Sequence, residues 1–450
     1  MTSSIDPAGT RLLAAFRADV LHGAPLPCTA IHPDDFMLRF FRERRHGHWE
    51  AAFVDYFRTG LAASRAVERL LDWWFGERRR QVPGDQVPRD QVPRDQVRLL
   101  DFASGYGRIT RHLVQHCSPR RLWVSDVFAE AVEFQRRAFG VHGFVSAAEP
   151  GALACAETFD CIVASSLFSH LPEESFSPWL RRLFALLRPG GMLLASVHDL
   201  SLRSLLGLAP ASPRAAAGEG TILFEPDSEI PELGGQRYGT TWVDEAFMRR
   251  AVAAATGGAA CVRLPRALSS FQDYYAIGVA APDGAPPQVA EPVGALEWAV
   301  RSPDGRELTL RGWAHDLHGP GLAAVEVRVD GTLAARCAAE DLRADVAARF
   351  GEPDLRAGWS TTVSAPAGGT LGGEAMISIQ AVSTSGLAHL IHLGSLEGTE
   401  LGLQLEWQSG LRRQAEAQAA AEIDRMRASR FWKLRDAWWA LKGALGLGRP

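Results

Sequence analysis

The residues best suited to chemistry lie in one stretch, Leu99–Arg108, which reads Leu-Leu-Asp-Phe-Ala-Ser-Gly-Tyr-Gly-Arg. An apolar run ends at the acid Asp101, and Gly105 and Gly107 follow before a helical pattern starts at Ile109. Glycines let a ligand approach the backbone, and a helix N-terminus offers free N–H groups. The stretch has no phosphate-loop lysine and no third glycine of a dinucleotide fingerprint. By itself it indicates an adenosine-containing ligand.

The segments around this stretch alternate between predicted strands and helices. Strands are expected at residues 97–100, 122–126, 143–146, 159–166, 192–197 and 271–280, and helices at 129–139 and 176–187. The second helix is expected to stop at Arg188-Pro-Gly-Gly, and a third helix is expected to open at Thr241 as its capping residue. This alternation predicts an α/β fold with a doubly wound, mostly parallel sheet. Ligands of such sheets bind at the carboxyl ends of the strands.

Residues 97–281 closely resemble the class I S-adenosylmethionine-dependent methyltransferases, which have a seven-stranded Rossmann-like sheet. The resemblance is carried by four segments in order. They are the Leu99–Arg108 stretch, the acid Asp126, the run Phe159-Asp-Cys-Ile-Val-Ala-Ser-Ser-Leu-Phe-Ser-His-Leu-Pro, and Leu187-Arg-Pro-Gly-Gly-Met-Leu-Leu. It implies S-adenosylmethionine as the cofactor.

The resemblance also implies roles for individual residues on the first strand and its turn. Asp101 would order the glycine turn and meet the methionine amine of the cofactor, directly or through water. Ala103, Gly105 and Gly107 would let the backbone approach the cofactor. Ala103-Ser104 departs from the family, in which Gly or Cys is common at this point.

On the later strands, Asp126 would accept both ribose hydroxyls, and Val127 would pack on the adenine face. Ser165 and Ser166 would border the methionine moiety. The loop at residues 146–150 lacks the acid that often meets the adenine amine, and Glu149 is a candidate substitute. The alternative for Asp101 and Asp126 is an ordinary strand-end cap.

Two histidines follow predicted strands and are candidate catalytic residues. A hydroxyl acceptor needs a general base with a pKa near neutrality, which histidine supplies. His198 precedes Asp199, which is placed in the sequence to orient it, and His170 follows the fourth strand. In the resembled family His170 also has an architectural or substrate-lining alternative. No metal ligands are expected.

The rest of the chain divides by composition. Residues 1–80 form a helical segment, either a lid over the ligand site or packing against the sheet, with a helix start near Pro33 and two acids. Residues 81–96 repeat Gln-Val-Pro-Arg-Asp and predict a solvated linker, because a proline every fifth residue excludes regular helix. Residues 282–293 form a second linker. Residues 294–397 predict an antiparallel β-sandwich with an Asp330-Gly331 hairpin turn.

Residues 401–446 predict an amphipathic or coiled-coil helix, with an apolar seam from Phe431 to Leu445 and mostly basic residues from Arg425 onward. Such a helix suits either an anionic membrane surface or self-association. The sandwich and the final helix look like parts of bacterial glycan-assembly proteins. This softer resemblance implies a sugar acceptor in surface-polysaccharide synthesis.

The composition of the chain limits the classes of partner and site that we expect. The 450 residues have a net charge of −4, which does not indicate a nucleic-acid footprint. Six scattered cysteines suggest neither a zinc site nor a disulfide framework. The first residues lack a signal-peptide pattern, and no apolar run is long enough to span a membrane, so we expect a cytoplasmic protein, with the final helix as a candidate peripheral contact.

Three functions remain open from the sequence. The first is an O-methyltransferase acting on a glycan or a nucleotide-sugar-derived acceptor. The second is a methyltransferase for a small metabolite or a protein, with the sandwich as a docking module. The third is a non-catalytic scaffold that organises glycosyltransferases.

Overall fold

The computed structural model describes residues 7–26, 28–76, 96–205, 208, 220–226, 233, 237–366 and 368–428. The predicted linker falls outside these ranges at residues 81–95, as does the apolar seam predicted from Phe431 to Leu445. Most of residues 206–236, which follow the fifth predicted strand, also lie outside.

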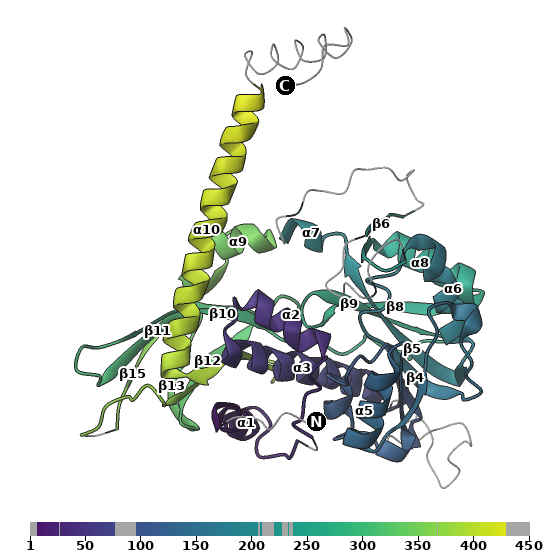
Figure 1. The fold of residues 1–450 in the computed structure, drawn as a ribbon, viewed down its shortest axis with the longest axis horizontal. Helices are drawn as coiled ribbons and strands as arrows, with labels where there is room; N and C mark the ends of the chain where they lie inside the picture. The colour runs from purple at the N-terminus through teal and green to yellow at the C-terminus, as the bar shows by residue number, and fades with distance from the viewer. Residues whose placement is uncertain are drawn as a thin grey trace, which may run out of the picture.

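A mostly parallel sheet forms the centre of the α/β part (Figure 1). Its parallel strands lie in the order β3 (His142–Val145), β2 (Leu122–Asp126), β1 (Leu99–Phe102), β4 (Phe159–Ala164) and β5 (Leu187–Asp199). Strand β9 (Gln272–Gly278) pairs antiparallel to β5, and β8 (Ala260–Leu268) pairs antiparallel to β9. The end of β5 also pairs with β7 (Thr240–Val243), which pairs with β6 (Ile222–Glu225). The expected fold is confirmed, and the strand order reverses between β1 and β4, where ligands of such sheets bind.

Helices cover both faces of this sheet, so its central strands are buried on both sides and read as continuous apolar runs. The helices of the α/β part are α4 (Thr110–Leu113), α5 (Ala129–Phe139), α6 (Glu173–Phe184), α7 (Leu202–Leu205) and α8 (Glu245–Thr256), with short 3₁₀ turns at Pro119–Arg121 and Pro150–Ala152.

Three local expectations are wrong. The Arg188-Pro-Gly-Gly segment lies inside β5, where pairing with β4 jumps from Phe159–Leu187 to Cys161–Met192, so the intervening residues bulge from the ladder. Helix α8 begins after Asp244, whose carboxylate accepts the Phe247 N–H, while Thr241 lies in β7. The helical pattern from Ile109 forms only the short α4, because the chain turns after Leu113.

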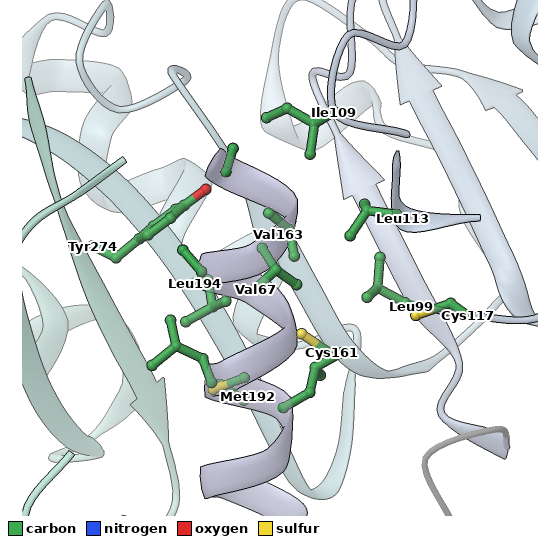
Figure 2. Packing of buried hydrophobic residues seen from close by; sticks show 14 of the residues in the cluster. Val67, Leu99, Ile109, Leu113, Cys117, Cys161, Val163, Met192, Leu194 and Tyr274 are labelled. Carbon is green, nitrogen blue, oxygen red and sulfur yellow. The ribbon is translucent and has the colours of Figure 1, made fainter. Parts of the chain in front are cut away.

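The N-terminal segment is helical, as expected, with α1 (Pro7–Asp19), α2 (Phe36–Arg44) and α3 (Trp49–Gly76). Asp35 caps α2 by accepting the Met37 N–H at 2.9 Å, at the predicted helix start. Helix α3 has 28 residues and is about 42 Å long. Figure 2 shows Val67 of α3 packed among Val163, Leu194 and Tyr274 of the sheet.

Helix α3 joins two parts of the molecule. Its second half belongs to the cluster under the α/β sheet, and Trp74 Nε1 donates to the Gly190 carbonyl of the β5 bulge. Its first half packs with Leu390 and Leu393 of β17 (Ala388–Ser395) in a separate cluster. The two parts therefore share one rigid helix, which sets how they face each other.

The C-terminal part has two four-stranded antiparallel sheets. One has the order β10 (Val293–Arg301), β11 (Glu307–His315), β15 (Arg356–Ser364) and β14 (Asp341–Leu342); the other has β13 (Thr332–Cys337), β12 (Leu322–Val329), β16 (Met376–Ser383) and β17. Residues of both sheets share one apolar cluster. The Asp330-Gly331 hairpin turn is confirmed, and the short helix α9 (Ala344–Phe350) lies between β14 and β15.

Helix α10 (Leu396–Ala428) projects away from the body of the molecule (Figure 1). It begins five residues earlier than expected, and its residue Trp407 is 66% exposed. Among the described residues, none of the helices combines the length and apolar character that crossing a bilayer requires.

Candidate functional site

A cavity of about 980 Å³ opens at the carboxyl ends of β1, β2, β4 and β5. The sequence-predicted site residues that line it are Asp101, Ala103, Gly105, Asp126, Val127, Ser165, Ser166, His170 and His198. Gly107 is the exception, since it lies outside the lining. The volume is at the upper end of ligand pockets, which leaves room for a cofactor and an acceptor together.

Asp126 holds the turn that follows β1. Its Oδ2 accepts the Gly105 N–H at 2.8 Å, and its Oδ1 accepts the Phe128 N–H at 3.1 Å. Burial raises the pKa of Asp126, and the N–H groups of Phe128 and Gly105 oppose that rise. Each carboxylate oxygen has a second lone pair, so the same side chain can still accept hydroxyls from a ligand.

The two glycines of the turn have different tasks. Gly105 has φ +56°, and a Cβ placed on it would meet nothing within 4 Å, so its backbone faces open space. Gly107 has φ +80°, and a Cβ there would lie 2.5 Å from Phe139 and 2.8 Å from Gln135 of α5. Gly107 therefore allows close packing of the turn against α5, and it lies outside the residues that line the cavity.

The departure from the family at Ala103 has a conformational consequence. Ala103 has φ +59° and Ser166, at the end of β4, has φ +58°. Left-handed backbone costs a non-glycine residue roughly 1–2 kcal/mol. Both strained residues line the cavity, which is where proteins tend to keep such strain.

Asp101 takes part in a buried network that the sequence does not reveal. Thr110 Oγ1 lies 2.7 Å from both Asp101 Oδ2 and Gln135 Oε1. The Gln135 amide is oriented by its own donation to Ser104 Oγ and the Gly105 carbonyl, each at 2.8 Å. One hydroxyl proton cannot serve two acceptors, so the network is satisfied when Asp101 is protonated. Burial raises the pKa of Asp101 to about 7, in agreement with this arrangement.

The end of β4 is tied to the edge of the sheet. Ser165 Oγ lies 2.6 Å from Tyr274 Oη, and the Ser166 N–H donates to Ser196 Oγ at 2.6 Å. Gln272 connects this end to β5, since its Oε1 accepts from Ser196 Oγ at 2.6 Å and its Nε2 lies 3.3 Å from His198 Nε2.

His198 lines the cavity but is a poor base. Its ring packs on Trp242 with centroids 4.8 Å apart. Burial, together with neighbouring His170, lowers the pKa of His198 to about 3, so the ring stays neutral near pH 7. The expected help from Asp199 is wrong, because adjacent side chains of β5 point to opposite faces. Asp199 binds Ser201 at 2.5 Å and Arg263 at 2.8 Å instead.

His170 is held in a defined tautomer. Its Nδ1 donates to the Gly239 carbonyl at 2.7 Å, so the lone pair of the neutral ring is on Nε2. Tyr238 stacks on the ring with centroids 4.7 Å apart, and His198 meets it edge-on at 6.0 Å.

Aromatic residues cover the turn, and sequence reasoning missed them. Phe36 of α2 lies 5.0 Å from Phe128 and 5.7 Å from Tyr106, centroid to centroid. Val127 beside them is 38% exposed and forms an open apolar shelf. Arg108, at the end of the motif, lines the same cavity and donates to Thr59 Oγ1 at 2.9 Å. Helix α2 therefore covers the ligand end, while α3 packs against the sheet.

The other wall of the cavity comes from the C-terminal part, through Gly294, Ala295, Trp313 and Phe350. No sequence signal links these residues to the site, because they come from remote elements. Glu149 does not line the cavity and instead pairs with Arg237 at 2.9 Å, so its substitution for an adenine contact lacks support. Within the described ranges, no three His, Cys, Asp or Glu side chains are grouped to hold a metal ion.

Comparisons with known proteins bear on the α/β part. Residues 100–193 match a family described as Methyltransferase domain. A search of curated proteins found none that matches the chain. Similar solved structures include an S-adenosylmethionine-dependent methyltransferase from Clostridium acetobutylicum, at 13% identity over 41% of this chain and 84% of that chain, with a TM-score of 0.30. Another is 1,6-didemethyltoxoflavin-N1-methyltransferase from Burkholderia thailandensis, at 17% identity over 56% of this chain and 90% of that chain, with a TM-score of 0.31.

Proposed function

We propose that this chain, which carries an S-adenosylmethionine-dependent methyltransferase domain, transfers a methyl group to a hydroxyl of a small acceptor bound in the same cavity. The observation that carries the proposal is the convergence on one cavity of Asp101 and Asp126 from one half of the sheet and His170 and His198 from the other. This convergence supports a donor site and a base that share one cavity.

The residues present fit the cofactor. Gly105 has open space where a Cβ would be, so a ligand can approach its backbone. Asp126 keeps a lone pair on each oxygen for the ribose hydroxyls, and the exposed Val127 offers an apolar surface for adenine. Asp101, Ser165 and Ser166 would border the methionine end, and the Arg108 guanidinium would meet its carboxylate. When bound, S-adenosylmethionine supplies an electrophilic methyl group.

The chain's own contribution to the chemistry is positioning and proton removal. Holding the acceptor oxygen in line with the donor provides much of the rate. We assign the base to His170, because its Nδ1–H is committed to the Gly239 carbonyl and Nε2 then carries the lone pair that accepts the proton. His198, whose pKa is lowered to about 3 by burial and by His170, stays neutral and shapes the acceptor pocket.

Two measurements test the proposal. Calorimetry with S-adenosylmethionine measures cofactor binding, and a radiolabelled-methyl assay measures transfer to a panel of free sugars and nucleoside diphosphate sugars. We expect binding and transfer, and we expect His170→Asn to lower kcat by roughly 10²-fold or more while cofactor affinity is kept. His198→Asn is the matched comparison and should lower kcat less.

The outcomes separate the alternatives. Absence of cofactor binding would refute the enzyme assignment. Binding without transfer to any acceptor would favour the scaffold alternative. A larger loss in His198→Asn than in His170→Asn would return the base to His198.

Finer parts of the proposal rest on sequence. We propose that the acceptor is a sugar hydroxyl in surface-polysaccharide synthesis. We also propose that the two C-terminal antiparallel sheets form a β-sandwich. The basic end of the final helix would make a membrane or homo-oligomer contact. The shared apolar cluster of the two sheets supports the sandwich. Liposome flotation of the full chain and of a chain ending at residue 424 tests the membrane contact: equal flotation of both would refute it.

A further inference from the structure

Three arginines line the far end of the cavity, and each comes from a different part of the chain. Arg44 is the last residue of α2, Arg266 lies near the end of β8, and Arg349 lies in α9. Their guanidinium groups flank two phenylalanine rings: Arg44 lies 5.2 Å from the Phe271 centroid, and Arg266 and Arg349 each lie 5.7 Å from the Phe350 centroid. The three are called the arginine cluster below.

The arginine cluster lacks carboxylate partners within the described part of the chain, whereas its neighbours are paired. Asp55 binds Arg45 at 2.7 Å and Arg58 at 2.6 Å. Arg263, three residues before Arg266, binds Asp273 at 2.7 Å and Asp199 at 2.8 Å. The nearby acids are therefore already occupied.

The arginines of the cluster repel one another, but nearby carboxylates act on them as well. Burial and then Arg45 are the main causes that lower the pKa of Arg44; Asp55 opposes them, and Arg349 adds a lowering effect smaller than that opposition. Burial also lowers the pKa of Arg266; Asp273 opposes this effect more strongly than Arg349 adds to it. Like charges gathered along one cavity repel one another, and a bound anion would relieve that repulsion.

The backbone turns sharply around Arg266, which brings this residue and the β8–β9 turn to the cavity. Arg266 has φ +52°, Ser269 has φ +53° and Ser270 has φ +60°, and all three line the cavity. The β8–β9 pairing is also irregular between Leu264 and Leu268. Leu268 pairs with Gln272, so Ser269 and Ser270 belong to the β8–β9 hairpin turn, where left-handed backbone is usual, and Arg266 lies at the irregularity of the pairing.

The same segment connects the arginine cluster to the catalytic end. Phe271, which carries Arg44 on its ring, precedes Gln272, whose Nε2 lies 3.3 Å from His198 Nε2. An acceptor that spans this segment would place an anionic group among the arginines and its reacting atom near His170 and His198. The acceptor would therefore bind in one orientation, with its reacting atom near the methyl donor and its anionic group among the arginines.

We propose that the arginine cluster of Arg44, Arg266 and Arg349 binds a phosphoryl group, preferably a diphosphate, of the methyl acceptor. A single carboxylate is satisfied by one bidentate arginine, whereas three converging guanidinium groups suit the several oxygens and charges of a diphosphate. Phe271 and Phe350 hold the guanidinium planes and exclude water. The proposal rests on the proposed function for its assignment of the anion to the acceptor.

The test uses the full chain and inorganic pyrophosphate as probe, with inorganic phosphate and the dicarboxylate malonate as comparison anions. We expect calorimetry to show pyrophosphate binding that weakens with added salt, tighter than either comparison anion. The Arg266→Gln/Arg349→Gln double variant should weaken pyrophosphate binding at least about tenfold. Arg306→Gln, which changes a 70% exposed arginine outside the cavity, should leave it unchanged.

Pyrophosphate binding by the double variant equal to that of the unchanged chain would overturn the proposal, and tighter malonate binding would overturn the phosphoryl assignment. If the double variant fails to fold, Arg349→Gln alone can be used, because Arg349 is exposed on α9. We expect this single variant to lose less pyrophosphate affinity than the double variant. Cofactor affinity, measured in parallel, keeps the two proposals apart. If the double variant loses pyrophosphate binding and keeps cofactor binding, the result supports the arginine cluster as the anion site. If the unchanged chain does not bind the cofactor, the result refutes the proposed function.

Discussion

Asp126 Oδ2 accepts the backbone N–H of Gly105 at 2.8 Å, so the acid that ends β2 holds the turn that follows β1. The same carboxylate accepts the Phe128 N–H at the start of α5. One side chain therefore connects the turn after β1 with the start of α5. In the proposed function, cofactor affinity depends on Asp126 in two ways, through the proposed ribose contact and through the shape of the turn.

Two substitutions of Asp126 should separate the effect of its negative charge on cofactor binding from the effect of its hydrogen bonds. We expect Asp126→Ala to weaken S-adenosylmethionine binding by roughly 10²-fold, because two charge-assisted hydrogen bonds are lost. Asp126→Asn should lose less, since its amide oxygen still accepts one N–H. Calorimetry measures both, with the exposed Asp304→Ala as control. Unchanged affinity in Asp126→Ala would contradict the assigned cofactor site.

The stability of the protein should depend on pH through Asp101. Burial raises its folded pKa to about 7 from an unfolded value of 3.8, so the folded state binds the proton more tightly. Its contribution to stability is complete below the unfolded pKa and is lost as pH rises toward about 7, by at most roughly 1.4 kcal/mol per pH unit. Urea unfolding between pH 5 and 8 should show this slope in the unchanged chain and not in Asp101→Asn. Equal slopes in both proteins would contradict the raised pKa.

The close packing of α3 against the cofactor turn makes Gly60 sensitive to substitution. A Cβ on Gly60 would lie 2.2 Å from the Arg108 carbonyl oxygen, which is backbone and cannot rotate away. We expect Gly60→Ala to destabilise the protein by about 2 kcal/mol and to weaken cofactor binding by shifting Arg108. Gly76→Ala in the same helix is the matched control, because a Cβ there meets nothing within 4 Å. Thermal unfolding that ranks the two variants equally would refute the steric explanation.

Tyr56 connects the cap of α2 to the core. Its hydroxyl donates to Asp35 Oδ2 at 2.6 Å and accepts from Arg111 Nη2 at 3.0 Å. We expect Tyr56→Phe to destabilise by about 1–3 kcal/mol and to increase hydrogen exchange at the start of α2. The control is Tyr275→Phe, because the buried Tyr275 hydroxyl has no hydrogen-bond partner within the described ranges and its removal should be neutral or stabilising. A larger loss in the control would show that the network contributes little.

Sequence patterns were most informative where structure depends on neighbouring residues. The strands ending at Phe102, Asp126 and Ala164 and the helix Ala129–Phe139 follow from local apolar runs and the helical period. The Asp330-Gly331 hairpin follows from turn chemistry. Errors arose where tertiary context decided the outcome, as at Arg188-Pro-Gly-Gly, which lies within β5 as a bulge between the residues that pair with β4 at Leu187 and at Met192.

The candidate site divides in the same way. The sequence by itself determined which acids, serines and histidines stand at strand ends, because the positions of strands along the chain follow from patterns of a few neighbouring residues. Only the tertiary structure decided that Gly107 faces α5, that Asp199 turns to Arg263, and that Thr110 and Gln135 surround Asp101. It also brought Arg44, Arg266 and Arg349 to one cavity. These residues are far apart in the chain, and their convergence depends on how α3 docks the two parts together, a packing outcome that no local pattern encodes.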